Sequence, residues 1–166
     1  MQSFPVAPCL NNMRQQTLFW IIGITSIIGL ALAVESTAAH YAAIPHTFCN
    51  FNDTFDCGAV NRGPYSTFLG IPVAIFGLVG YIFFLISSVV YGYTRNELLL
   101  TFMGTAAIVG FAFTLYLIYL EAFVIYAWCI VCLGSALCMT ILFTAIMYLR
   151  RLETKTTTPT MKEIHQ

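Results

Sequence analysis

The sequence predicts an all-α membrane protein, a four-transmembrane-helix bundle with an outer loop that carries a short helix. Hydrophobic residues make up 59% of the 166 residues and charged residues only 8%, whereas a soluble domain usually has about 25% charged residues. The apolar residues gather into four blocks, each close to the roughly 20 residues that a helix needs to cross hydrocarbon. Composition and block length together therefore favour a membrane chain.

We expect the four spans at about 17–34, 68–92, 98–120 and 126–149. The first block is followed by the small residues of "ALAVESTAAH", a pattern that also fits a cleaved signal peptide. Between Leu98 and Leu149 the one charged residue is Glu121. The division there into two helices depends on length, because one helix of that size would far exceed the bilayer at about 1.5 Å per residue. The turn between these two spans should lie near 121–128.

The basic residues predict which side each connection faces. Arg14 precedes the first span and Arg95 lies in the tight connection "YTRNE". Four more basic residues follow the last span: Arg150, Arg151, Lys155 and Lys162. With four spans these regions share one side, and the positive-inside rule makes that side the cytoplasm. We therefore expect a cytoplasmic tail at 1–16, a membrane domain at 17–149 with an outer loop at 35–67, and a disordered cytoplasmic tail at 150–166.

Two classes of function are disfavoured by the residue pattern. The formal net charge is zero and the basic residues form no long patch, so nucleic acid is not an expected partner. A four-thiolate zinc site is opposed by spacing, because Cys49 and Cys57 are separated by "NFNDTFD", which is longer than the two to four residues typical of zinc knuckles.

Four of the six cysteines fall on the outer face of the predicted topology. Cys129 and Cys132, in "WCIVC", are spaced i, i+3, so on a helix they share one face and their sulfurs can pair. They also lie at the predicted start of the fourth span, where free backbone N–H groups and the helix dipole lower a thiol pKa. Cys9, in the cytoplasmic tail, and Cys138, inside the last span, are interpreted as bystanders.

The outer loop contains signals for a short helix through Cys57. Asp53 and Thr54 are possible N-caps, and Gly63–Pro64 is the expected stop. Phe51 and Phe55 give this loop an apolar side that would lie on the mouth of the bundle, or would simply anchor the loop at the membrane interface. A loop tied down by permanent disulfides fits the same cysteines.

The combination resembles the vitamin K epoxide reductase family. The resemblance consists of a spaced Cys pair in the first outer loop, "GPYSTFLGIPVAIFG" opening the second span, and "WCIVC" at the start of the fourth, and it covers roughly 18–149. Members are four-helix membrane proteins that couple thiol–disulfide exchange to a quinone bound within the bundle. Bacterial members oxidise thioredoxin-like partners, whereas animal members reduce vitamin K.

The resemblance implies roles for particular residues. Cys129 and Cys132 match the active-site pair, and Cys49 and Cys57 match the loop cysteines that shuttle electrons to it. The Ser that the family uses for quinone hydrogen bonding is replaced by Gly63, and Ser66 is the candidate substitute. Phe51 and Phe55 would cap the quinone site, in which Cys132 meets the ring.

The sequence departs from known members in two further places. Ala136 stands where animal epoxide reductases have a Tyr, which disfavours epoxide reduction. The chain is also expected to lack the fused thioredoxin-like domain that some bacterial members have, since it ends soon after the fourth span. A separate thioredoxin-like partner is then implied.

The sequence thus predicts a monomeric thiol–disulfide oxidoreductase of the bacterial inner or plasma membrane. It would take electrons from an extracytoplasmic partner and pass them to ubiquinone or menaquinone, in contact with membrane lipid. Two alternatives stay open from the residues: a quinone or quinone-epoxide reductase whose product is the reduced quinone, and a non-enzymatic scaffold with a disulfide-stapled loop.

Overall fold

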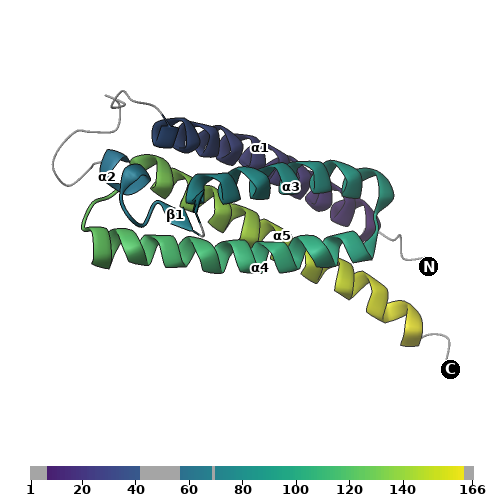
Figure 1. Ribbon diagram of the computed structural model, residues 1–166. Helices are drawn as coiled ribbons and strands as arrows, with labels where there is room; N and C mark the ends of the chain where they lie inside the picture. Colours follow the sequence, from purple (N-terminus) through teal and green to yellow (C-terminus); the bar gives the residue numbers. More distant parts are fainter. Residues whose placement is uncertain (1–6, 42–56, 69, 163–166) are drawn as a thin grey trace.

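A computed structural model describes residues 7–41, 57–68 and 70–162 as a bundle of long helices (Figure 1). In chain order the elements are α1 (Ala7–Tyr41), α2 (Cys57–Arg62), β1 (Thr67–Phe68), β2 (Ile71–Pro72), α3 (Val73–Thr94), α4 (Glu97–Leu120), the π-helix η1 (Glu121–Ile125) and α5 (Ile130–Lys162).

Four helical stretches are long and apolar enough to cross a membrane. They are Met13–Tyr41, Val73–Thr94, Glu97–Ile125 and Ile130–Thr154. The start of α1, the connection between α3 and α4, and the end of α5 lie at one end of the bundle, whereas α2 lies at the other (Figure 1). The predicted fold, a four-helix membrane bundle with a short loop helix, is confirmed.

The connection between α3 and α4 is short because two local signals stop one helix and start the next. Arg95 adopts a left-handed conformation, with φ of 49°, and its N–H donates to the carbonyl of Tyr91. Asn96 then caps α4, since its side chain accepts a hydrogen bond from the Leu98 N–H at 2.9 Å. The two helices therefore run antiparallel through neighbouring positions.

A small hairpin stands where the second span was expected to begin. The strands β1 and β2 are antiparallel, with Thr67 paired to Pro72 and Phe68 to Ile71. Gly70 has φ of 79°, which a tight turn requires and which glycine adopts without strain. Pro72 then caps α3, so the helix begins at Val73 and the expectation of a helix from 68 is wrong.

The chain ends also differ from expectation. Helix α1 begins at Ala7, inside the predicted tail at 1–16, and α5 continues to Lys162 through most of the tail predicted to be disordered at 150–166. Composition alone suggested both tails. A helix that is already nucleated by a membrane span, however, adds one hydrogen bond for each further residue and needs no apolar face to continue.

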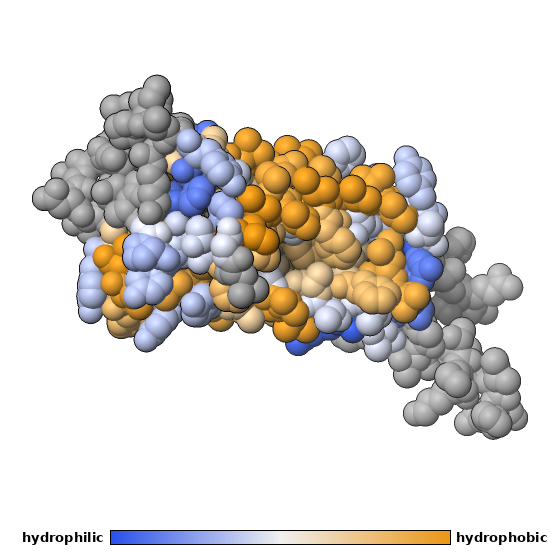
Figure 2. Space-filling model, in the orientation of Figure 1, coloured by the Kyte–Doolittle hydropathy of each residue, from blue (hydrophilic) through white to orange (hydrophobic). Residues whose placement is uncertain are grey.

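Helix α1 packs along both α3 and α5, and α4 packs mainly against α5. The core between them contains fully buried apolar side chains from three helices, among them Ile22, Met103 and Leu142. Large apolar side chains also cover the middle of the outer surface, with hydrophilic residues towards the ends (Figure 2). Such a surface is costly in water and natural in lipid.

Candidate active site

The cysteine pair lies at the first turn of α5, and Cys129 acts as the N-cap of that helix. The Cys129 carbonyl accepts a hydrogen bond from the Leu133 N–H at 2.9 Å, and its sulfur accepts one from the Cys132 N–H at 3.3 Å. A capping side chain satisfies a backbone donor that has no partner within the helix. The i, i+3 spacing thus places the Cys132 amide directly on the Cys129 sulfur.

Helix α2 brings a third cysteine to this pair. The sulfurs of Cys57 and Cys129 are 3.3 Å apart, and both side chains are buried, at 4% and 0% exposure. Cys57 is disulfide-bonded, while Cys129, Cys132 and Cys138 are free. The partner of Cys57 is therefore none of these three, and Cys49, the predicted partner, lies outside the described residues.

Polar side chains of α1 hold α2 in this place. Ser36 donates a hydrogen bond of 2.7 Å to the side-chain oxygen of Asn61, and His40 Nδ1 contacts the Asn61 carbonyl at 2.5 Å. The amide of Asn61 in turn points to the Cys129 sulfur at 3.8 Å. Because Asn61 is one turn after Cys57, these contacts fix the height and rotation of the short helix against α5.

The surroundings favour the thiolate of Cys129. Its pKa is lowered from the ordinary value for a thiol, chiefly by a hydrogen bond from the Cys132 side chain and further by the backbone amides of Cys132 and Val131. Burial and the nearby Glu121 carboxylate act in the opposite direction. Cys129 is therefore the better nucleophile and the better leaving group of the pair.

Glu121 faces the pair from the other side. Its carboxylate is 4% exposed and accepts a hydrogen bond of 3.3 Å from the Cys129 N–H. Glu121 is the first residue of η1, and the chain turns at Tyr126, whose φ is 54°. The wide π turn and the left-handed residue bring Glu121 back onto a residue eight positions later.

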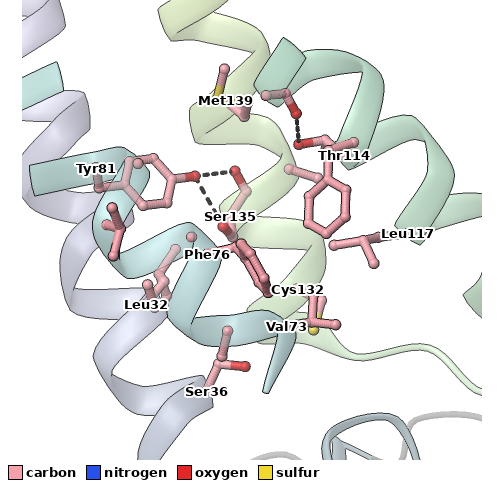
Figure 3. A pocket seen from close by; sticks show the side chains of 18 of the residues that line it. Leu32, Ser36, Val73, Phe76, Tyr81, Thr114, Leu117, Cys132, Ser135 and Met139 are labelled. Atoms are coloured by element: carbon pink, nitrogen blue, oxygen red, sulfur yellow. Dashed lines mark hydrogen bonds between the residues drawn. The ribbon is translucent and has the colours of Figure 1, made fainter. Parts of the chain in front are cut away.

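An apolar cavity of about 940 Å³ begins at Cys132 and extends along the bundle (Figure 3). Residues of α3 and α4 form most of its wall, and the remainder comes from α1, α2, the hairpin and the residues just before it, η1 and α5. Polar groups are few. One pair is Tyr81 and Ser135, whose hydroxyl groups lie 2.9 Å apart, with the Tyr81 hydroxyl also donating to the Ser135 carbonyl at 2.7 Å (Figure 3).

The cavity fits a quinone in size and chemistry. Small-molecule sites are mostly apolar, with a few polar groups that set orientation. Val79 of α3 and Val109 of α4 line the cavity and are also 61% and 64% exposed on the outer surface. The cavity thus reaches the lipid-facing side of the bundle between these two helices, where a ligand with an isoprenoid tail would enter.

The predicted site residues fall into two groups. Cys57, Cys129 and Cys132 meet at the start of α5, and Ser66 lines the cavity that Cys132 opens into. Cys49, Phe51 and Phe55 lie outside the described residues. Of the cysteines interpreted as bystanders, Cys9 lies in the first turn of α1, and Cys138 is buried in the apolar core of the bundle.

Sequence reasoning did not identify Glu121, Asn61, Ser36 or His40 as parts of the site. Two signals were present. Glu121 is the one charge between Leu98 and Leu149, and a charge inside a span marks a functional site by default. Ser36 and His40 are spaced i, i+4 and therefore share a helix face at the outer end of the first span.

Comparison with known proteins identifies one family. The model of the vitamin K epoxide reductase family matches residues 20–147, a segment that contains α3 and α4, the larger part of α1 and of α5, and the cysteine pair. A comparison with curated proteins finds no match. Members of the matching family are membrane oxidoreductases with quinone-linked redox activity, so this match and the four apolar helices identify an integral membrane protein.

Proposed function

The chain belongs to the vitamin K epoxide reductase family, and from this premise we propose that it is the bacterial, disulfide-generating type of member. It would take electrons from an extracytoplasmic thioredoxin-like protein and pass them through two cysteine pairs to a quinone. The protein acts as a monomer in the bacterial inner membrane, with both termini in the cytoplasm and the cysteines on the outer face.

The observation on which this proposal depends is the contact of 3.3 Å between the sulfurs of Cys57 and Cys129. Thiol–disulfide exchange requires a thiolate to reach a disulfide sulfur, and no movement of α2 is needed for that here. Cys132, three residues further, lines the large apolar cavity. These contacts support an electron path from Cys57 through Cys129 to Cys132 and the cavity.

The electron path consists of two exchanges and one reduction. The dithiol of the partner attacks a Cys49–Cys57 disulfide at Cys49, and the partner leaves as a disulfide with the loop pair reduced. Cys57 then attacks Cys129 in a Cys129–Cys132 disulfide and releases Cys132 as a thiolate. Attack by Cys49 on Cys57 then restores the loop disulfide and leaves Cys129 and Cys132 reduced; the disulfide-bonded Cys57 and the free Cys129 and Cys132 are compatible with this state.

A bound quinone, ubiquinone or menaquinone, supplies an acceptor for two electrons and two protons. Cys132 would contact its ring, and Ser66 or the Tyr81–Ser135 pair would orient a ring oxygen. Phe51 and Phe55 are proposed to cover the site from the outer loop. Ala136 lines the cavity at the position of the Tyr of animal epoxide reductases, which supports quinone rather than epoxide as the acceptor.

The test is anaerobic reduction of the purified protein in lipid nanodiscs by a reduced thioredoxin, with and without added ubiquinone. The redox state of each cysteine is read from the mass increase on alkylation. We expect Cys49, Cys57, Cys129 and Cys132 to become reduced without quinone and to be oxidised again when quinone is added, with catalytic consumption of thioredoxin thiols. Four thiols that stay reduced in the presence of quinone would contradict the proposal, and disulfides that thioredoxin leaves intact would indicate the stapled scaffold.

A parallel reaction with vitamin K epoxide in place of quinone tests the alternative activity. The proposal predicts turnover with quinone and none with the epoxide, because Ala136 offers no hydroxyl group to the epoxide oxygen. Turnover with the epoxide at a rate similar to that with quinone would favour the epoxide reductase instead.

A further inference from the structure

Glu121 is the single buried side chain with a formal charge among the residues that the structure describes. A carboxylate in an apolar bundle is unfavourable unless hydrogen bonds compensate for the lost water. The carboxyl group of Glu121 has such a partner in the Cys129 N–H, at 3.3 Å. This partner belongs to the reacting pair, so the carboxylate is placed beside the redox centre itself.

Its backbone position is specialised for this contact. Glu121 begins the five-residue π-helix η1, directly after the regular helix α4. A π turn inserts one extra residue and rotates the following side chains relative to a regular helix. Glu121 also lines the cavity that Cys132 lines, so one carboxyl group borders the thiol and the space for the acceptor.

The chemistry of the pair leaves one proton to be moved. The Cys132 N–H donates to the Cys129 sulfur and favours Cys129 as the thiolate, so Cys132 holds the one thiol proton of the pair. Two groups beside the pair can accept that proton: the Cys129 sulfur, and the Glu121 carboxylate, which accepts from the Cys129 N–H and lines the same cavity as Cys132. When the Cys129–Cys132 disulfide forms, the thiolate and the thiol together lose two electrons and this one proton. Transfer of the proton to Cys129 would abolish the thiolate, so the carboxylate is the productive acceptor.

We propose that Glu121 is a catalytic base that removes the proton of Cys132 as the disulfide forms and then donates it to the reduced quinone in the cavity. This inference rests on the proposed function, in which the pair reduces a quinone. Reduction to the hydroquinone takes two protons. Glu121 supplies one, and water at the outer face supplies the second, which replaces the proton that Cys129 lost when it ionised.

Infrared difference spectroscopy tests the proton on Glu121 without any quinone. The reduced protein is oxidised with excess diamide, an azo compound that takes two electrons and two protons and becomes a hydrazine. We expect a carboxylic acid C=O band in the oxidised state that shifts in D2O and is absent in Glu121→Gln. The matched control is Glu97→Gln, which changes an exposed carboxylate at the opposite end of the same span and should retain the band. A band that is unchanged in Glu121→Gln would overturn the proposal.

The kinetics of the two half-reactions, disulfide exchange with thioredoxin and reduction of quinone, distinguish a residue that carries a proton from one that only positions the pair. Glutamine keeps an oxygen that accepts the Cys129 N–H, but it cannot accept a proton. We expect Glu121→Gln to exchange disulfides with reduced thioredoxin within a few fold of the unmodified protein and to reduce a short-chain ubiquinone about 100-fold more slowly, as is typical when a general base is lost. Equal slowing of both half-reactions would mean that Glu121 only shapes the site.

Glu121→Ala provides the second variant if glutamine perturbs folding. Removal of the side chain leaves space for formate, and added formate should restore part of the rate of quinone reduction in Glu121→Ala but not in Glu121→Gln. No rescue in a folded Glu121→Ala protein would count against proton transfer. Failure of the unmodified protein to pass electrons from thiols to quinone would contradict the proposed function. Normal quinone reduction by Glu121→Gln would contradict only the role of Glu121 as a base.

Discussion

Cys129 combines two roles at the residue scale, because one sulfur is both a helix cap and a reactive thiol. Its N-cap position supplies the Cys132 N–H, and the i, i+3 spacing supplies the Cys132 thiol as a second donor. Any substitution of Cys132 that removes this second donor but keeps the helix should raise the pKa of Cys129.

The pH at which Cys129 reacts tests this arrangement. The rate of alkylation of Cys129 by iodoacetamide is measured against pH by peptide mass, in a Cys9→Ala, Cys138→Ala background. The midpoint of this pH dependence should lie below the ordinary thiol pKa, because the thiolate persists to lower pH. Cys132→Ala should move the midpoint to higher pH, and Cys132→Ser, which retains a donor, should restore most of the shift. Restricted access of the reagent to the buried sulfur slows the reaction at every pH alike and leaves the midpoint unchanged. Identical midpoints in the two Cys132 variants would contradict the role of the side-chain donor.

The different roles proposed for the cysteines lead to a second prediction at this scale. Cys132→Ser should abolish quinone reduction, since it removes the thiol at the cavity wall. Cys9→Ser and Cys138→Ser should leave turnover within a few fold, because Cys138 packs as a small apolar side chain in the core. Quinone-dependent oxidation of a thiol substrate measures all three. Loss of activity in a folded Cys138→Ser protein would refute this division.

At the scale of elements, the relay depends on how α2 is docked against α5. In the double variant Cys49→Ser with Cys132→Ser, the proposed disulfide partner of Cys57 and that of Cys129 are both replaced. Their sulfurs are 3.3 Å apart, so we expect a Cys57–Cys129 disulfide on mild oxidation. A non-reducing peptide map detects it. Two free thiols under oxidising conditions would exclude the relay.

The polar contacts that hold α2 against α1 can be weakened within the same experiment. Asn61→Ala removes the side chain that accepts from Ser36 and approaches the Cys129 sulfur. In the double variant this change should slow formation of the Cys57–Cys129 disulfide, because α2 loses a hydrogen bond that sets its position against α1. Unchanged formation would show that apolar packing alone docks the short helix.

Close packing of α1 on α3 positions the cavity wall. A Cβ atom on Gly29 would overlap the ring of Tyr81, whereas one on Gly23 would meet nothing within 4 Å. Gly29→Ala should therefore destabilise the protein by about 1–3 kcal/mol through overpacking, and Gly23→Ala should be neutral or stabilising by up to about 1 kcal/mol through helix propensity. Thermal unfolding in detergent compares them. Equal stabilities of the two glycine variants would show that α1 and α3 can move apart at this contact without cost.

At the scale of the whole molecule, the arrangement of the helix ends leads to a topology prediction. The start of α1, the connection between α3 and α4 and the end of α5 share one end of the bundle (Figure 1), and basic residues are concentrated there. A reporter fused after Gln166 and one inserted between Thr94 and Glu97 should both report cytoplasm. An external signal from the C-terminus alone would mean an odd number of spans, most simply a cleaved first segment.

Much of this molecule was determined by its sequence alone. Hydropathy and block length predicted four spans, Gly63–Pro64 predicted the end of α2, and the "WCIVC" stretch predicted a thiol pair at the start of the last span. These features are local, because each depends on residues within one segment of the chain. The ends of the helices were predicted less well, since continuation of a helix past the membrane depends on hydrogen bonding rather than on hydrophobicity.

Tertiary structure alone decided which of these residues meet. The contact between Cys57 and Cys129 joins positions 72 residues apart, and no local periodicity encodes it. Glu121 reaches the pair through a π turn, a change of register that composition does not reveal. The cavity between α3 and α4 likewise arises from how four apolar surfaces pack. Side chains that face lipid and side chains that face a neighbouring helix are equally apolar, so hydropathy does not indicate which faces of the helices pack together. The tertiary structure was needed to show this packing.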